Sequence, residues 1–207
     1  GGVRRFSASA VPGSVPVWLL VPIAYLLGTF PSAVLIARAH GVDIDTFGSG
    51  NPGASNVTRA LGWRKGVWVY VLDAGKGAIA AGLGLALDGR PMAYWCGAAV
   101  ILGHMFPVFR AFKGGKGVAT GSGVLLIVQP ILAPLAVGLW WLVSRLTGKA
   151  ALGSVTAVVL VPIGLVVQGK PAWEFFAVAG LCALIVVKHA GNIVRLVRRE
   201  EHSLTRS

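Results

Sequence analysis

The sequence predicts an all-α integral membrane protein, and three observations lead to that prediction. Hydrophobic residues make up 55% of the chain and charged residues only 13%, whereas a soluble domain has about 25% charged residues. Apolar runs long enough for a membrane helix of about 20 residues recur along the chain, beginning with an uncharged run at residues 15–37. The basic residues behind the net charge of +12 lie in short clusters between these runs. That pattern argues against nucleic-acid binding, which uses a continuous basic surface.

The apolar runs define the expected membrane spans. The segment 118–144 has no formal charge but is interrupted at Pro130, so it is either one tilted helix or two short ones. We interpret residues 15–201 as one domain, with an N-terminal tail at 1–14 that we leave out of the argument and a C-terminal tail at 202–207. The expected spans are, in chain order, 15–37, 66–87, 91–109, 118–144, 150–167 and 172–187.

The distribution of basic residues decides how often the chain crosses the membrane, because Lys and Arg are enriched in cytoplasmic loops. A single crossing by 118–144 gives six spans and divides the basic residues almost evenly between the two sides. A turn at Pro130 gives seven spans and leaves few basic residues outside. We therefore predict a seven-helix bundle with short or re-entrant helices in 118–144, the N-terminus outside and the C-terminus in the cytoplasm. The outside residues are then only Arg4, Arg5, Arg90 and Lys170.

This topology brings polar segments that are far apart in the sequence to the same cytoplasmic face. They lie around Asn51, around Lys116, at the turn before Ser154 and at the end of the last span near His189. Because alternate connections of a helical bundle meet at one end, we expect these four segments to share one site.

The stretch 103–123, GHMFPVFRAFKGGKGVATGSG, has the features of an anion site. Glycines expose backbone N–H groups beside Lys116 at the start of an expected helix, and such groups bind phosphate or carboxylate. It is not a Walker loop, because Gly117 occupies the position of the required Ser or Thr and residue 110 is Arg instead of Gly. A nucleoside triphosphate is therefore disfavoured. We interpret Lys113 as a membrane-surface anchor and Lys116 as the anion-binding residue.

The segment 48–59, GSGNPGASNVTR, formally matches the G-x-G-x-x-G pattern. The match is weak, because a dinucleotide site also needs a βαβ unit and here the flanking segments are apolar spans. Its glycines and the Arg59 guanidinium could still surround a phosphate. A plain glycine-rich turn at the entrance of a helix fits the pattern equally well.

Asp73, Lys76 and His104 are ionisable residues inside expected spans. Asp73 and Lys76 lie three residues apart on one helix face, and ionisable residues at that depth are usually paired and functional. Either a structural pair or a direct role in a site is consistent with their spacing. We interpret His104 as a hydrogen-bonded core histidine.

The end of the last span carries His189, Asn192 and Arg195 on neighbouring faces of a helix. Histidine suits proton transfer near neutral pH, whereas the arginines of this segment are interpreted as anchors in anionic lipid headgroups. No nucleophile elbow and no metal-ligand spacing is present. Cys96 and Cys182 are expected to be small buried side chains.

Together, the segments GSGNPGASNVTR, LDAGKG, GHMFPVFRAFKGGKGVATGSG and KHAGNIVRL resemble the bacterial acyl-phosphate-dependent glycerol-3-phosphate acyltransferases of phospholipid synthesis. The resemblance extends from about residue 31 to residue 201. It implies a seven-helix enzyme of the bacterial inner membrane whose site faces the cytoplasm. The reaction would transfer an acyl chain from acyl phosphate to the 1-hydroxyl of glycerol 3-phosphate, giving lysophosphatidic acid and phosphate. Its implied partners are these substrates and membrane lipids, with no nucleic acid, metal or other cofactor.

The resemblance also implies roles for individual residues. Two positions depart from the family pattern: Ala151 replaces a serine that is common before the sixth helix, and Asp45 stands where a basic residue is common. The implied catalytic residues are Ser49, Lys116 and His189. The implied substrate-binding residues are Arg59, Asn192, Gly114, Gly115 and Ser154, and the implied supporting residues are Asn51, Asn56, Asp73, Lys76 and His104.

Two other classes of protein would also explain parts of the pattern. A transporter for a small phosphorylated solute also uses buried cations and broken helices, but the polar clusters here are expected at one face only. A membrane scaffold without catalytic activity leaves the glycine and lysine cluster unexplained.

Overall fold

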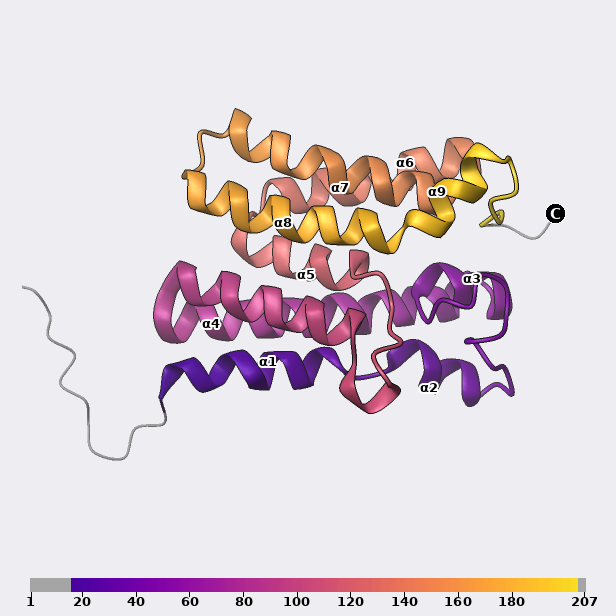
Figure 1. The fold of residues 1–207 in the computed structure, drawn as a ribbon, viewed down its shortest axis with the longest axis horizontal. Helices are drawn as coiled ribbons and strands as arrows, with labels where there is room; N and C mark the ends of the chain where they lie inside the picture. The colour runs from indigo at the N-terminus through magenta and orange to yellow at the C-terminus, as the bar shows by residue number, and fades with distance from the viewer. Residues whose placement is uncertain (1–15, 205–207) are drawn as a thin grey trace, which may run out of the picture.

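The computed structural model describes residues 16–204, and these residues form an all-helical bundle without a strand (Figure 1). This confirms the predicted fold class. The predicted N-terminal tail, 1–14, lies outside the described residues. The 3₁₀ helices are η1 (Val17–Leu19) and η2 (Val108–Arg110). The α-helices are α1 (Leu20–Gly28), α2 (Ser32–Arg38), α3 (Ala54–Leu61), α4 (Trp63–Met105), α5 (Val118–Val128), α6 (Leu132–Thr147), α7 (Ala150–Val167), α8 (Ala172–Lys188) and α9 (Ala190–Val197).

The first apolar run forms one candidate span, Val17–Arg38, which is broken between α1 and α2. Pro31 causes the break, because proline lacks an N–H donor and keeps the preceding residue out of the helical conformation. The break leaves the Phe30 carbonyl without a helical partner, and Lys76 Nζ donates to it at 3.2 Å. A membrane helix tolerates such a break when another helix satisfies the freed group in this way.

Helix α4 is two antiparallel arms joined by a tight turn at Asp88 and Gly89, between the expected spans 66–87 and 91–109. Asp88 and Gly89 have non-helical backbone angles, and Gly89 has a φ of 77°. The arms pack closely beside this turn, because a Cβ added at Gly84 would meet the backbone of Met92. Figure 1 shows both arms lying side by side along the bundle. The two arms of α4 therefore account for two of the expected spans.

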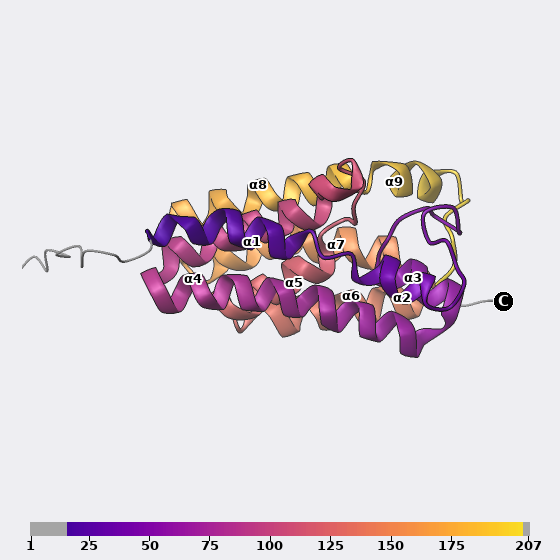
Figure 2. The ribbon, with the colours of Figure 1, turned by 90° about the horizontal axis from the view of Figure 1, so that it is seen from below.

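The predicted turn at Pro130 is confirmed, since α5 ends at Val128 and α6 begins at Leu132. Helix α5 has 11 residues and is about 16 Å long at 1.5 Å per residue, which is shorter than a bilayer core of about 30 Å. It lies in the interior of the bundle, between α4 on one side and α7 and α8 on the other (Figures 1 and 2). Its position in the interior explains how so short a helix is accommodated.

Seven apolar segments run along the described bundle: α1 with α2, the two arms of α4, α5, α6, α7 and α8. Among the described residues, three helical stretches are long and apolar enough to cross a membrane, or four if the bent α8–α9 pair is one span. Helices α5 and α6 are shorter apolar helices. Large apolar side chains face outward, including Leu26, Trp95 and Phe176, which are 50%, 65% and 71% exposed. Such a surface is suited to lipid.

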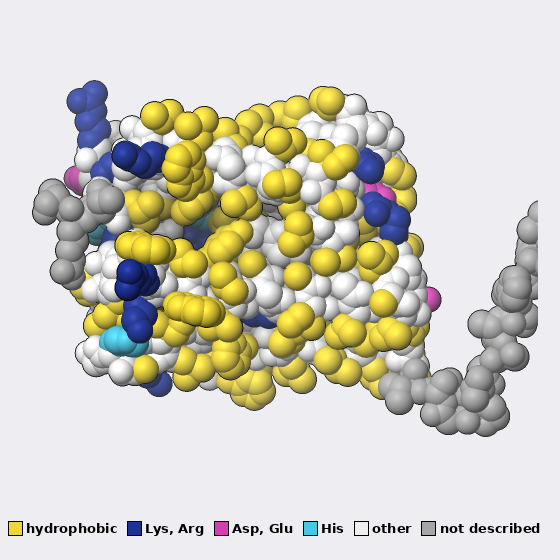
Figure 3. All heavy atoms as spheres, turned by 180° about the vertical axis from the view of Figure 1, so that it is seen from behind, with side chains coloured by type: hydrophobic (Ala, Val, Ile, Leu, Met, Phe, Trp, Pro, Cys, Tyr) yellow, Lys and Arg dark blue, Asp and Glu magenta, His cyan; other side chains and the backbone are white. Residues whose placement is uncertain are grey.

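The connections alternate between two ends of the bundle. The polar end carries α3, the loop 106–117, the connection 148–149 and residues 189–204, whereas the opposite end carries the turns after α5 and α7 (Figure 1). Basic side chains gather at the polar end, a smaller group lies at the opposite end, and an apolar belt covers the surface between the ends (Figure 3). The four polar segments that we expected to meet therefore do meet at one end.

Close approach of α4 and α5 depends on small residues. A Cβ at Gly77 would collide with the backbone of Thr120, and a Cβ at Gly123 would collide with the backbone of Ala74. Small residues at a membrane helix interface allow the backbones to approach and gain van der Waals contact. This contact holds the first turn of α5, which follows Lys116, against the rest of the bundle.

We predict that Gly77→Ala destabilises the bundle by about 1–3 kcal/mol, because overpacking forces α4 and α5 apart. The matched control is Gly75→Ala on the same helix, where an added Cβ meets nothing within 4 Å. Thermal unfolding of the purified protein in detergent measures the difference. Equal unfolding temperatures for the two variants would contradict the proposed close contact.

Candidate functional site

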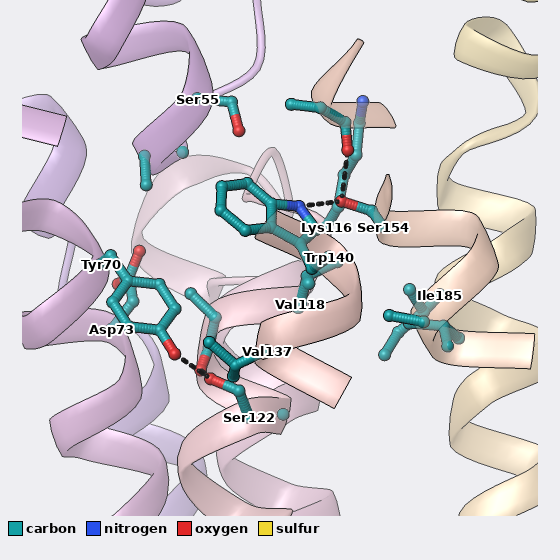
Figure 4. A pocket seen from close by; sticks show the side chains of 18 of the residues that line it. Ser55, Tyr70, Asp73, Lys116, Val118, Ser122, Val137, Trp140, Ser154 and Ile185 are labelled. Carbon is teal, nitrogen blue, oxygen red and sulfur yellow. Dashed lines mark hydrogen bonds between the residues drawn. The ribbon is translucent and has the colours of Figure 1, made fainter. Parts of the chain in front are cut away.

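A cavity of about 880 Å³ begins at the polar end and continues between α4, α5, α6, α7 and α8 (Figure 4). Exposed Trp63, Val67 and Trp141 belong to its lining, so it also opens through the apolar surface. Figure 3 shows this face of the molecule hollowed toward the polar end. Beyond the polar end the walls are largely apolar. The predicted site residues that line the cavity are Ser49, Asn51, Asn56, Arg59, Asp73, His104, Lys116, Ser154, His189 and Asn192.

Lys116 stands where the polar end of the cavity meets its apolar part. Gly117 follows it with a φ of 85°, a left-handed conformation that favours glycine, and begins α5. The start of α5 has no side-chain cap, so its first N–H groups add positive character beside the lysine. Lys116 Nζ donates to Asn192 Oδ1. Burial lowers the pKa of Lys116 to about 8, although the Glu201 carboxylate acts in the opposite direction.

His189 and Asn192 are positioned by the bend of 56° between α8 and α9. His189 is 3% exposed, and its Nδ1 lies 2.8 Å from the Ile185 carbonyl. Because a carbonyl only accepts, Nδ1 carries the proton and Nε2 carries the lone pair. Asn192 uses its oxygen for Lys116 and its Nδ2 to donate to Glu201 Oε1 at 2.8 Å.

Glu201 is a residue of the site that the sequence reasoning missed. It is 3% exposed, and its carboxylate also accepts from Arg195 Nε at 3.0 Å. Lys149 Nζ donates to its backbone carbonyl. A buried carboxylate stabilises the cations around it and is in turn stabilised by them. The structure corrects the interpretation of Arg195 as a lipid anchor, because its side chain pairs with Glu201.

Arg59 on α3 reaches the last described residues of the chain. Its Nε donates to the Ser203 carbonyl at 2.7 Å and its Nη2 to the His202 carbonyl at 3.4 Å. The first residues of the predicted C-terminal tail therefore pack on the site. A guanidinium has five N–H donors, so further donors remain for an anion. Burial lowers the pKa of Arg59, but a guanidinium stays charged at any physiological pH.

Asn56 holds the loop that carries Ser49. Its side chain is 1% exposed, accepts from the Ser49 N–H at 3.3 Å and donates to the Phe47 carbonyl at 2.8 Å. Gly48 and Gly50 have φ values of 57° and 63°, which explains the glycines on both sides of Ser49. The geometry fits the supporting role expected for Asn56.

The ionisable residues inside α4 form a buried network with α2. Lys76 Nζ lies 2.8 Å from Asp73 Oδ1 and 2.8 Å from His104 Nδ1, and Ser32 Oγ donates to Asp73 at 2.6 Å. Asp73 and Lys76 are 1% and 4% exposed, so each charge depends on the other. The network joins α2 to both arms of α4. This geometry agrees with the first of the two roles considered for Asp73 and Lys76, that of a structural pair.

Gly114 and Gly115 do not lie where the expected role as anion donors would need them. The Gly115 N–H donates to the His104 carbonyl at 3.1 Å, and an added Cβ at Gly115 would overlap the His104 ring. Both glycines line a small pocket next to His104 and do not line the main cavity. They let the loop pack closely on His104 and so bring Lys116 to the cavity. Lys113 is exposed, in agreement with its interpretation as an anchor.

Ser154 lines the cavity with its hydroxyl already hydrogen-bonded. Its Oγ donates to the Ala150 carbonyl at 2.9 Å and accepts from Trp140 Nε1 at 3.1 Å (Figure 4). Ala151, at the position where the family often has serine, lines the same wall without a hydroxyl. Asp45 is not among the cavity residues and forms an ion pair with Arg110, which explains the acidic residue at that position.

The fold and the cavity define a class of protein: a membrane-embedded protein with a cationic site at the end of an apolar cavity. A site of this kind fits a ligand that combines an anionic group with an apolar chain. This class is consistent with either an enzyme of lipid metabolism or a carrier of a lipid-like anion.

Comparison with known proteins identifies the family. The family model described as glycerol-3-phosphate acyltransferase matches residues 18–199. A glycerol-3-phosphate acyltransferase of Aquifex aeolicus is 42% identical over 88% of this chain and 96% of its own. Glycerol-3-phosphate acyltransferase 1 of Deinococcus radiodurans is 40% identical over 90% of this chain and 94% of its own. The chain belongs to the glycerol-3-phosphate acyltransferase family.

Solved structures agree with this assignment. The integral membrane glycerol 3-phosphate acyltransferase PlsY, in its glycerol 3-phosphate form, has a TM-score of 0.86 and 41% identity to this chain. That match covers 90% of this chain and 94% of the solved one. Its lysophosphatidic acid form has a TM-score of 0.84. The membrane fold is therefore shared with an acyltransferase of known structure.

Proposed function

We propose that this protein transfers an acyl chain from acyl phosphate to the 1-hydroxyl of glycerol 3-phosphate, giving lysophosphatidic acid and phosphate. The observation that carries the proposal is one continuous cavity with Lys116, Arg59 and Asn192 at one end and apolar walls along the rest. Such a cavity can hold a soluble phosphorylated acceptor and an acyl chain side by side. Bringing two reactants together supplies much of the rate increase when the donor is already activated.

The acceptor phosphate would bind at the polar end. Arg59 has unused donors, Lys116 supplies a charge, and Ser49 lines the same end of the cavity. Charge-assisted hydrogen bonds of this kind are the strong ones for phosphate. The solved relative named for its glycerol 3-phosphate form supports this acceptor.

The donor phosphate would lie beside Lys116 and the first N–H groups of α5. When the hydroxyl oxygen of the acceptor bonds to the acyl carbon, the bond from that carbon to the phosphate oxygen breaks and phosphate leaves. Charge develops on the leaving phosphate, and a preorganised cation and N–H groups stabilise it. Gly114 and Gly115 have only a positioning part in this proposal, because the Gly115 N–H is bonded to His104.

The proton of the attacking hydroxyl has two candidate acceptors. One is His189 Nε2, which carries a lone pair and has no hydrogen-bond partner among the described residues. The other is an oxygen of a substrate phosphate. Both acceptors balance the reaction, since the proton ends on the imidazole or on phosphate.

A transporter of a phosphorylated solute is the rival function. Alternating access needs a path to both faces, but the opposite end of this bundle is filled by a hydrogen-bonded cluster of Arg90, Gln129 and Glu174.

The enzyme proposal also assigns the polar end to the cytoplasmic face of a bacterial inner membrane, because most basic residues lie there.

The direct experiment incubates the purified protein in detergent with a long-chain acyl phosphate and glycerol 3-phosphate and follows phosphate release. Release that needs both substrates, together with lysophosphatidic acid detected by mass spectrometry, is the expected result. Release that does not depend on glycerol 3-phosphate, or transfer only from another activated acyl donor, would overturn the proposal.

The pKa of Lys116 predicts the alkaline limit of activity. Only the cation attracts phosphate, so kcat/KM for glycerol 3-phosphate should fall as the pH rises through about 8, well below the ordinary lysine value of 10.5. A phosphate monoester has its second pKa near about 6, so the substrate charge does not change in this range.

The matched variant is Lys116→Arg, because a guanidinium keeps its charge to beyond about pH 12. This variant should lose the decline near pH 8, whatever its maximal rate. The same decline in both proteins would show that another group titrates.

A further inference from the structure

The cavity ends at the opposite end of the bundle against a polar cluster around the buried Glu174 and Gln129, which the reaction does not use. Tyr94 on the second arm of α4, and Val128 at the end of α5, line the cavity there. Val161 on α7 and Val178 on α8 complete this end. Lys116 precedes α5 and Val128 ends it, so the cavity continues along the whole helix, a distance of about 16 Å at 1.5 Å per residue.

The Tyr94 ring is held rigidly in this end wall. Its hydroxyl donates to Glu174 Oε2 at 2.6 Å and accepts from Gln129 Nε2 at 2.9 Å. The ring of Trp173 packs against it edge to face, with 5.1 Å between ring centroids. Tyr94 is 7% exposed, so it cannot turn aside without breaking these contacts.

The polar cluster behind the ring is centred on the carboxylate of Glu174, whose side chain is 4% exposed, whereas the Arg90 side chain that pairs with it is 42% exposed. Glu174 accepts from Arg90 Nε at 3.0 Å and from Arg90 Nη2 at 2.7 Å, and Arg90 Nη2 also donates to the Val128 carbonyl at 3.2 Å. Gln129 donates to Glu174 at 2.6 Å. A methylene that entered this cluster would separate the buried Glu174 carboxylate from its hydrogen-bond partners, which is costly because the carboxylate would be left unpaired.

We propose that this end wall, formed by Tyr94 with Val128 and Val161, is a stop that sets the longest acyl chain the protein transfers well. The inference rests on the proposed function, because the ligand whose length the end wall limits is the acyl chain of the donor. Each methylene that fits in the cavity gains about 0.8 kcal/mol, or roughly fourfold in binding. A methylene beyond the wall gains nothing and must displace the ring or the polar cluster.

Val161 is the best position for a test, because it lines the end of the cavity and belongs to a helix that also has a lipid-facing valine. Val161→Phe adds volume at the wall and shortens the cavity. Val159→Phe is the matched control, since Val159 is 49% exposed and does not line the cavity. Val161→Ala removes volume and lengthens the cavity.

The experiment measures kcat/KM for saturated acyl phosphates of increasing even chain length, in detergent micelles with saturating glycerol 3-phosphate. For Val161→Phe, the preferred chain should become shorter by about two carbons, with an approximately fourfold loss for each methylene that no longer fits. Val161→Ala should lengthen the preferred chain, because it lengthens the cavity. Val159→Phe should keep the chain-length profile of the unmodified protein.

An unchanged profile in both Val161 variants, with activity retained, would overturn the stop and would indicate that the chain leaves sideways between the exposed Val67 and Trp141. If Val161→Phe fails to fold, Val161→Ala still decides the question, because an unchanged or shortened preference for it alone contradicts a wall. No transfer by the unmodified protein from an acyl phosphate of any length would instead overturn the proposed function.

Discussion

The site depends on keeping Lys116 charged next to an apolar cavity. A lone ammonium in such a place is costly, because burial disfavours the charged form. The contact with Asn192 and the field of Glu201 counter that cost. Glu201 also contacts Asn192 and Arg195, so one carboxylate organises the polar end of the last helices. Lys116 therefore stays charged and available for an anion.

The rest of the architecture brings this lysine to the cavity. Close packing of α4 on α5 positions the first turn of α5, and the loop before it packs on His104. His104 belongs to the network with Lys76 and Asp73, which ties α2 to both arms of α4. Buried contacts therefore link α2 and the two arms of α4 to Lys116, although these helices contribute no side chain to the anion site. At the opposite end the cavity meets Tyr94, whose hydroxyl is hydrogen-bonded to the Glu174 carboxylate that Arg90 pairs with.

The sequence was enough to predict the helical membrane class, the turn at Pro130 and the meeting of four polar segments. Apolar runs, prolines and the bias of basic residues are local or additive signals, and these features follow from them. Details that depend on how loops fold back were out of reach. Glu201 lay at the edge of the expected domain, and only the packed structure shows that it turns back to Asn192. The same limit explains Gly115, whose N–H looked free in the sequence and is bonded to His104.

The measurement that tests the central claim most directly compares Lys116→Ala with Lys113→Ala in the reaction of acyl phosphate with glycerol 3-phosphate. Both variants remove a lysine from the same loop, but Lys116 lines the cavity and Lys113 is exposed outside it. Loss of a preorganised charge at a reacting phosphate predicts a kcat about 10²–10³-fold lower for Lys116→Ala, with near-normal activity for Lys113→Ala. Thermal unfolding should show both variants folded. Full activity of Lys116→Ala, or an equal loss in both variants, would contradict the account.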